Sequence, residues 1–102
     1  HVAQHSYLLR RLKSTPDGVD GNLLDNSMIC YGSAISDGDR HNNENLPILL
    51  AGHGGGRIDA GRHIRVAPET PVCNLFMSML DRFGTPVDFI GDSTGRLTNL
   101  QI

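Results

Sequence analysis

The sequence contains no tryptophan, and tyrosine and phenylalanine together contribute only five of its 102 residues. So few aromatic residues, without a basic cluster, argue against a protein that stacks on nucleic-acid bases. The formal net charge of −2 also gives no electrostatic reason to expect binding to nucleic acid or to an anionic membrane surface. No apolar run approaches the roughly 20 residues that a transmembrane helix needs. We therefore expect neither a nucleic-acid partner nor a membrane span in this chain.

Cysteine is scarce as well. Cys30 and Cys73 are the two cysteines, and no C-x-x-C spacing of the kind found in zinc sites is present. We interpret both as reduced core residues, because free cysteine is among the most buried residue types. A disulfide or a shared metal is the alternative interpretation.

The length and composition indicate at most one globular domain. Hydrophobic residues make up 38% of the chain and charged residues 20%, which argues against disorder. A chain of 102 residues can bury only a modest core. Because the first residue is His1 rather than methionine, we expect the chain to begin inside a longer product.

The pattern of apolar residues predicts two helices. The first spans residues 2–14, and its cations gather near the C-terminal end, where they suit the helix dipole. The second spans residues 71–83, with Thr70 as N-cap, Pro71 in the first helical position and Gly84 as a left-handed C-terminal residue. One face of the second helix collects its large apolar side chains, which are Val72, Leu75, Phe76, Met79, Leu80 and Phe83.

Short apolar runs predict two buried strands, at residues 28–31 and 48–51. Residues 57–66 alternate imperfectly and predict a β-hairpin or an edge segment, and residues 87–90 predict a further short strand. Residues 91–95 (GDSTG) predict a turn. Two helices with so few strands do not complete an α/β sheet, so we expect the closing portion of a larger sheet.

The loop between the two predicted strands carries the first group of candidate ligands. Asp37, Asp39 and His41 occupy alternate positions, and Gly38 lets the backbone turn. Carboxylate oxygens and an imidazole nitrogen can converge on a divalent cation at this spacing. The alternative is that the two aspartates form Asx turns while the histidine is solvated.

The second group follows the second predicted strand, in the run His53-Gly54-Gly55-Gly56-Arg57. An H-G-G-G sequence after a strand is typical of the oxyanion-hole loop of lipase-like esterases, but the G-x-S-x-G nucleophile motif that such enzymes need is absent. The favoured interpretation is a tight strand exit that needs positive φ angles. His53, Gly54 and Arg57 remain candidates for shaping a substrate pocket.

Cations near these elements form a third group. Together they could bind an anion, although such residues are more often a solvated face. The residues are Arg57, Arg62, His63, Arg65 and Arg96.

Several motifs, in order along nearly the whole chain, resemble the C-terminal end of the bacterial "domain of unknown function 1552" family. They are L-L-D-N-S-M-I-x-Y-G-S-x-x-S-D-G-x-R-H-N, N-L-P-I-L-L-A-G-x-G-G-G, G-R-H-I-R, T-P-V-x-N-L-F-x-S-M-L-D-R-F-G-x-P-V and G-D-S-T-G-R-L. That family looks like a divergent branch of the alkaline phosphatase and sulfatase superfamily. Its members resemble exported bacterial proteins, which implies a periplasmic or cell-envelope location.

The resemblance implies a fold and a set of metal ligands. The expected fold is α/β, as the C-terminal portion of a three-layer α/β/α sandwich with two main helices, two to three core strands and a β-hairpin. Ser36-Asp37-Gly38 matches the S-D-H-G motif of that superfamily with one residue missing. The resemblance thus implies Asp37 as a ligand of a divalent metal ion, His41 as a second and Asp39 as a weaker third. It places the nucleophile far upstream, in no residue of this chain.

Two functional hypotheses follow. The first is metal-assisted hydrolysis of a phosphate or sulfate ester by a protein of which this chain is the C-terminal part, inactive by itself. The second is a non-catalytic module that binds a carbohydrate or a partner on a degenerate hydrolase scaffold, which the shortened S-D-G motif favours. The sequence leaves the substrate, the metal and the oligomeric state open.

Overall fold

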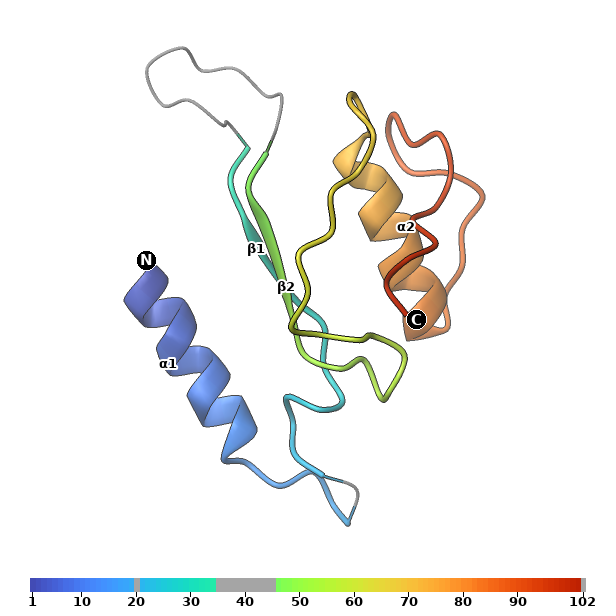
Figure 1. Ribbon diagram of the computed structural model, residues 1–102. Helices are drawn as coiled ribbons and strands as arrows, with labels where there is room; N and C mark the ends of the chain where they lie inside the picture. The colour runs from blue at the N-terminus through green and yellow to red at the C-terminus, as the bar shows by residue number, and fades with distance from the viewer. Residues whose placement is uncertain (20, 35–45, 102) are drawn as a thin grey trace.

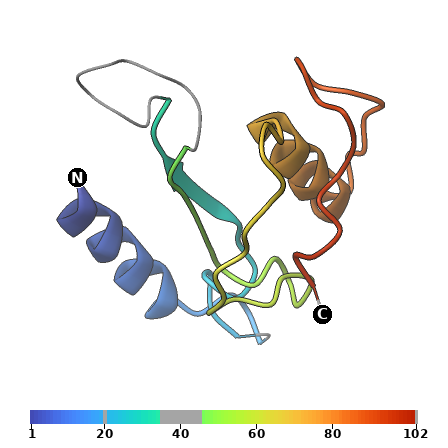
Figure 2. The same ribbon diagram turned by 45° about the horizontal axis from the view of Figure 1, so that its top comes forward.

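Two helices lie on either side of a two-stranded antiparallel sheet, as both views of the computed structural model show (Figures 1 and 2). The structure describes residues 1–19, 21–34 and 46–101. Along the chain the elements are α1 (Val2–Lys13), β1 (Ile29–Gly32), β2 (Ile48–Ala51) and α2 (Val72–Phe83). The fold of the described residues is therefore mixed α/β.

The sheet consists of β1 and β2. Ile29 pairs with Ala51 and Gly32 pairs with Ile48, so the two strands form the arms of a hairpin. The bounds predicted for the second strand are confirmed, whereas β1 begins and ends one residue later than predicted. The prediction that both strands are buried is wrong, because their residues are half-buried or exposed. Neither strand forms a backbone hydrogen bond to a described residue outside this ladder, so the outer edge of each strand is open.

Helix α1 ends one residue before the end of its predicted range, residues 2–14, and contacts the rest of the described chain weakly. None of its residues is buried. His5, Leu9 and Leu12 are half-buried and share one face, because they are spaced by four and three residues. The His5 ring stacks on the Tyr31 ring of β1 with centroids 4.5 Å apart. This stack joins α1 to the sheet.

Helix α2 begins one residue later than predicted. Pro71 is the N-cap, with φ −64° and ψ 141°, and it forms no side-chain cap. The Thr70 hydroxyl donates to the Ala67 carbonyl instead, so the prediction of Thr70 as N-cap is wrong. Gly84 ends the helix at φ 87°, in the left-handed conformation that the sequence predicted.

The buried face of α2 matches the predicted apolar face only in part, because Leu75 is buried, Val72, Met79 and Leu80 are half-buried, and the two phenylalanines are exposed. Phe76 is 36% exposed and Phe83 is 74% exposed. The residues of α2 that are buried are Asn74, Leu75, Met77 and Ser78. Ile58 and Leu100 are the other buried hydrophobic residues among those described. The core therefore lies between α2, the loop after β2 and the last residues of the chain.

Asn74 and Ser78, one helical turn apart, bind the C-terminal segment to α2 through hydrogen bonds. The Asn74 amide donates to the Thr94 hydroxyl and accepts from the Thr94 N–H, at 3.1 and 2.9 Å. Ser78 Oγ donates to the Leu97 carbonyl at 2.9 Å and accepts from the Leu97 N–H at 2.8 Å. Because these four bonds pair the polar groups of both side chains, they offset the cost of removing Asn74 and Ser78 from water.

Two predicted β elements are absent from the described residues. Residues 57–66 form neither a hairpin nor a strand, and residues 87–90 form no strand. The Asp59 N–H donates to the Leu100 carbonyl, and the Arg62 side chain donates to the carbonyls of Asp59 and Asn99. The segment is thus held by the C-terminal residues instead of by a neighbouring strand. The predicted turn at residues 91–95 is confirmed, since the Ser93 N–H donates to the Ile90 carbonyl at 2.8 Å.

We expect Ser78→Ala to lower the free energy of unfolding by about 1–3 kcal/mol, because it leaves the N–H and C=O of Leu97 without partners. Urea denaturation followed by circular dichroism measures this change, and hydrogen exchange of the Leu97 amide should accelerate. Ser6→Ala, at an exposed position of α1, is the control and should change stability by less than about 0.5 kcal/mol. Equal stability of the two variants would show that the C-terminal segment is held without these bonds.

Candidate functional site

The candidate metal ligands Asp37, Asp39 and His41 lie outside the described residues. The chain that contains them joins the paired residues Gly32 and Ile48. Their assignment as ligands therefore stays a prediction. Among the described residues, no three His, Cys, Asp or Glu side chains come together in a way that could hold a metal ion.

The candidate substrate residues follow the opposite end of β2. His53, Gly54 and Arg57 come after Ala51, whereas the metal candidates come before Ile48. A strand rises about 3.3 Å per residue, so β2 alone separates its two ends by about 10 Å. The hairpin thus does not by itself bring the two groups of candidates together.

The glycine loop uses its backbone N–H groups within the fold. The N–H groups of His53, Gly54 and Gly55 donate to the carbonyls of residues 24, 27 and 25, at 3.3, 3.0 and 2.9 Å. The N–H groups of Gly56 and Ile58 both donate to the His53 carbonyl. An oxyanion hole needs N–H groups that are free to bind a developing negative charge. In this conformation the loop therefore attaches β2 to residues 24–27, and its N–H groups are not presented to an anion.

Positive φ angles explain the glycines of this loop. Gly52, Gly54, Gly55 and Gly56 have φ angles of 95°, 52°, 71° and 93°. These values confirm the predicted strand exit that glycine adopts without steric cost. A Cβ on Gly52 would collide with the Ser27 carbonyl oxygen, whereas a Cβ on Gly55 would meet nothing within 4 Å. The close backbone approach is thus specific to Gly52.

Arg57 forms a reciprocal pair with Arg82, a residue that the sequence analysis did not single out. Arg57 Nη1 donates to the Arg82 carbonyl at 3.4 Å, and Arg82 Nε donates to the Arg57 carbonyl at 3.0 Å. Arg82 also donates to the Ser78 carbonyl at 3.1 Å. The pair joins the loop after β2 to the last turn of α2. No sequence motif signals it, because the two residues are 25 positions apart.

Arg96 also serves the fold. Its Nε donates to Asp81 Oδ2 at 2.6 Å, and its Nη2 donates to the Val87 carbonyl at 2.8 Å. The hydrogen bond to Asp81 raises the pKa of Arg96 further above its ordinary value. Together with Arg62, which binds two carbonyls, these contacts do not bring the five predicted cations into one anion site.

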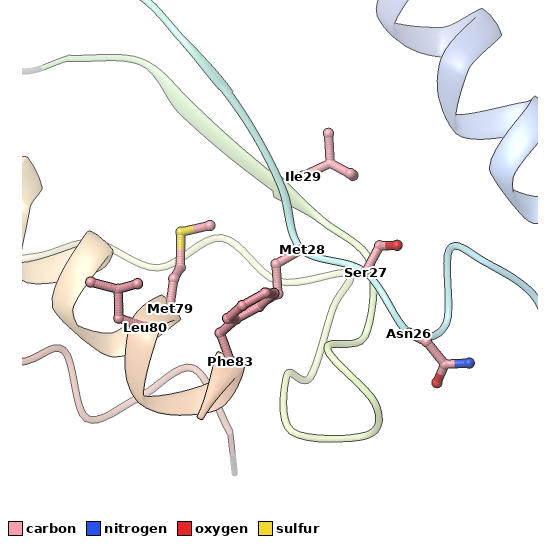
Figure 3. Close-up of a pocket in the computed structure, with 7 residues that line it drawn as sticks. All are labelled: Asn26, Ser27, Met28, Ile29, Met79, Leu80 and Phe83. Atoms are coloured by element: carbon pink, nitrogen blue, oxygen red, sulfur yellow. The ribbon is translucent and has the colours of Figure 1, made fainter. Parts of the chain in front are cut away.

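A small apolar pocket lies between α2 and the residues that precede β1 (Figure 3). It has a volume of about 360 Å³, and Phe83 of α2 points toward Met28 at its mouth. The hydroxyl of Ser27 donates to the Leu23 carbonyl, and the amide of Asn26 donates to Asp17. No titratable side chain lines this pocket, so it offers no group for acid–base chemistry. Its lining residues are Asn26, Ser27, Met28, Ile29, Met79, Leu80 and Phe83.

A larger crevice, of about 2110 Å³, opens between the sheet and α2. Residues of α1, both strands and the segment 58–72 line it. This volume exceeds the roughly 300–1,000 Å³ of a typical small-molecule pocket. Apolar residues on its walls include Leu9, Leu50, Ile58, Leu75 and Phe76.

The two cysteines are free, but they are not both in the core. Cys30 is exposed and Cys73 is half-buried, so the prediction of a buried Cys30 is wrong. The short strand β1 alternates its side chains, and Cys30 falls on the side away from the half-buried Ile29 and Tyr31. Local desolvation of the thiol nevertheless raises the pKa of Cys30 above its ordinary value, which disfavours the reactive thiolate.

Comparison of the chain with protein-family models, curated proteins and solved structures gives no match. In the described part of the chain, neither helix is long and apolar enough to cross a membrane. The assignment of the candidate site residues therefore rests on the sequence motifs and on the geometry given above.

We expect Gly52→Ala to destabilise the fold by more than about 3 kcal/mol, because the methyl group meets the Ser27 carbonyl and the residue keeps a positive φ. Gly55→Ala shares the positive φ without the collision and should cost about 1–2 kcal/mol. Thermal and urea unfolding of the two variants measure the difference. A cost for Gly52→Ala no greater than that for Gly55→Ala would contradict the close approach of β2 to Ser27.

Proposed function

We propose that this chain forms part of a metal-dependent hydrolase of phosphate or sulfate esters, related to the alkaline phosphatase and sulfatase superfamily. One observation carries the proposal. The Ser36-Asp37-Gly38 motif and His41 fall between two strands, the second of which follows Pro47, in the order that the superfamily motif requires. The proposal includes membership of the "domain of unknown function 1552" family and, with it, an exported or cell-envelope location.

The donor set suits a divalent cation. Two carboxylates and an imidazole, from Asp37, Asp39 and His41, are oxygen and nitrogen ligands that Zn²⁺ and Mn²⁺ accept. A bound cation would polarise the ester and offset the negative charge that develops in hydrolysis. In this proposal Asp37 and His41 hold the ion and Asp39 is an additional ligand. His53, Gly54 and Arg57 shape the substrate pocket in a second conformation, in which they leave the contacts described above and contact the substrate. No residue of the chain acts as nucleophile.

The proposed fold is a three-layer α/β/α sandwich to which this chain contributes its C-terminal portion. Open outer edges on β1 and β2 support it, because a two-stranded sheet is marginal and unpaired edges call for further strands. The apolar crevice beside β2 supports it as well. So does the exposure of Phe83 and Phe89, which are 74% and 72% exposed.

A non-catalytic binding module is the second candidate function. The missing residue beside Asp37 favours it, because the superfamily motif there supplies a further ligand. Such a module would keep the scaffold and bind a carbohydrate or a partner without a metal. Metal binding therefore separates the two proposals.

We expect the purified chain to retain about one equivalent of Zn²⁺ or Mn²⁺ after equilibrium dialysis, measured by inductively coupled plasma mass spectrometry. Asp37→Asn and His41→Gln should each abolish retention, because each removes a ligand, and Asp39→Asn should reduce it less.

The matched controls are Asp92→Asn and His63→Gln, which change the same residue types at exposed positions outside the motif. Both should bind metal like the unaltered chain. Absence of metal from the unaltered chain, with circular dichroism showing that it is folded, would refute the metal site and favour the binding module.

A further inference from the structure

The charges of this chain are segregated. Residues 1–16 contain Arg10, Arg11 and Lys13 and no acidic residue, so they carry a formal charge of +3. The chain as a whole carries −2, so residues 17–102 carry −5. The small net charge therefore conceals a basic helix α1 attached to an acidic remainder.

Helix α1 presents a second face that no described residue covers. The face toward the sheet holds the half-buried His5, Leu9 and Leu12. Tyr7, Leu8 and Arg11 are spaced so that they share another face, and all three are exposed. Tyr7 is 59% exposed and Leu8 is 44% exposed. Both views show α1 at one side of the molecule, with nothing beyond it (Figures 1 and 2). We name Tyr7, Leu8, Arg10 and Arg11 the outer face of α1, because Lys13, four residues after Leu9, lies on the side toward the sheet.

The cations of the outer face have no partner among the described residues. No hydrogen bond or ion pair joins the side chain of Arg10 or Arg11 to a described residue. Cations in a last helical turn do suit the helix dipole. The dipole gives no reason, however, for a tyrosine and a leucine to stand exposed among them. An external anionic surface with an apolar component would satisfy both kinds of side chain.

A lipid surface has this chemistry. Tyrosine is enriched at the level of the lipid headgroups, leucine can enter the acyl boundary, and arginine keeps its charged end among the phosphates. Nucleic acid fits less well, because contacts to a phosphate backbone have no use for Leu8 and the acidic remainder repels a long polyanion. Charge complementarity and the exposed apolar side chains therefore favour the lipid surface.

We propose that the outer face of α1 binds anionic lipid headgroups. This inference goes beyond the proposed function and does not depend on it, because it uses no metal ligand and no residue of the substrate pocket. Each cation near an anionic bilayer strengthens binding about fivefold, so the two cations of the outer face give weak and reversible attachment. The attachment orients the molecule with α1 parallel to the lipid surface.

Cosedimentation of the full chain with lipid vesicles tests the proposal. Vesicles of phosphatidylcholine with about 30% phosphatidylglycerol should bind the chain, and vesicles of phosphatidylcholine alone should bind it at least fivefold less, on the order of one cation's contribution. Binding should fall severalfold between about 50 mM and about 300 mM salt, because salt screens charges at a surface. No sedimentation with anionic vesicles at the lower salt concentration would overturn the proposal.

Arg11→Glu and Arg65→Glu form a matched pair, since both residues are exposed and both changes alter the net charge equally. Arg11→Glu should weaken vesicle binding at least about fivefold, and Arg65→Glu by less than about twofold. An equal loss in both variants would mean that net charge alone drives binding, which contradicts a site on α1.

Leu8→Ser separates lipid from nucleic acid as the partner. It should weaken vesicle binding and leave binding to a double-stranded oligonucleotide unchanged, because only a bilayer accepts the leucine side chain. Tighter binding to the oligonucleotide than to the vesicles, with no effect of Leu8→Ser on either, would assign the outer face to nucleic acid and overturn the lipid proposal. Circular dichroism checks that each variant keeps its helices.

Discussion

The hydrogen bonds from Asn74 and Ser78 to the C-terminal segment are the constraint on which the packing of α2, the loop after β2 and the last residues of the chain depends. Few hydrophobic side chains are buried, and two of the four described, Ile58 and Leu100, pack through segments without regular structure. Such segments keep their shape only if their backbone groups find partners. Residues 94 and 97 find them on α2, and the Leu100 carbonyl then accepts from the Asp59 N–H. Asn74 and Ser78 thereby provide hydrogen-bond partners for the backbone of the C-terminal segment, as a neighbouring strand would in a sheet.

Local sequence signals predicted what depends on local physics. The bounds of β2, the start of α1 and the left-handed Gly84 follow from apolar spacing and from the φ preference of glycine. The failures occur where distant residues decide. Residues 57–66 alternate like a strand, but Asp59 and Arg62 form hydrogen bonds with the C-terminal residues and not with a strand. The periodicity of the sequence cannot indicate these distant partners. The face of α2 was predicted only in part, because the sequence pattern did not indicate the burial of Asn74 and Ser78, which bind residues 94 and 97.

The candidate site is less predictable than the fold. Glycines after β2 were correctly interpreted as a strand exit, yet the direction of their N–H groups depends on carbonyls of residues 24–27, which no motif reveals. The metal candidates Asp37, Asp39 and His41 and the pocket candidates follow opposite ends of one short strand. Spacing along the sequence can suggest ligands, but the strand geometry decides which of them meet.

Several of the contacts described above that join distant segments are hydrogen bonds from arginine side chains, and the use of arginine has a chemical consequence. Arg57, Arg62, Arg82 and Arg96 each bind at least one backbone carbonyl, and three of them engage two acceptors at once. A guanidinium group offers five donors in a rigid plane and keeps its proton throughout the range of pH in which proteins fold. Lysine would preserve the charge at these positions but would lose the planar geometry that spans two acceptors. These contacts are therefore insensitive to proton concentration and sensitive to the shape of the cation, so an exchange that looks conservative by charge is not conservative for this fold.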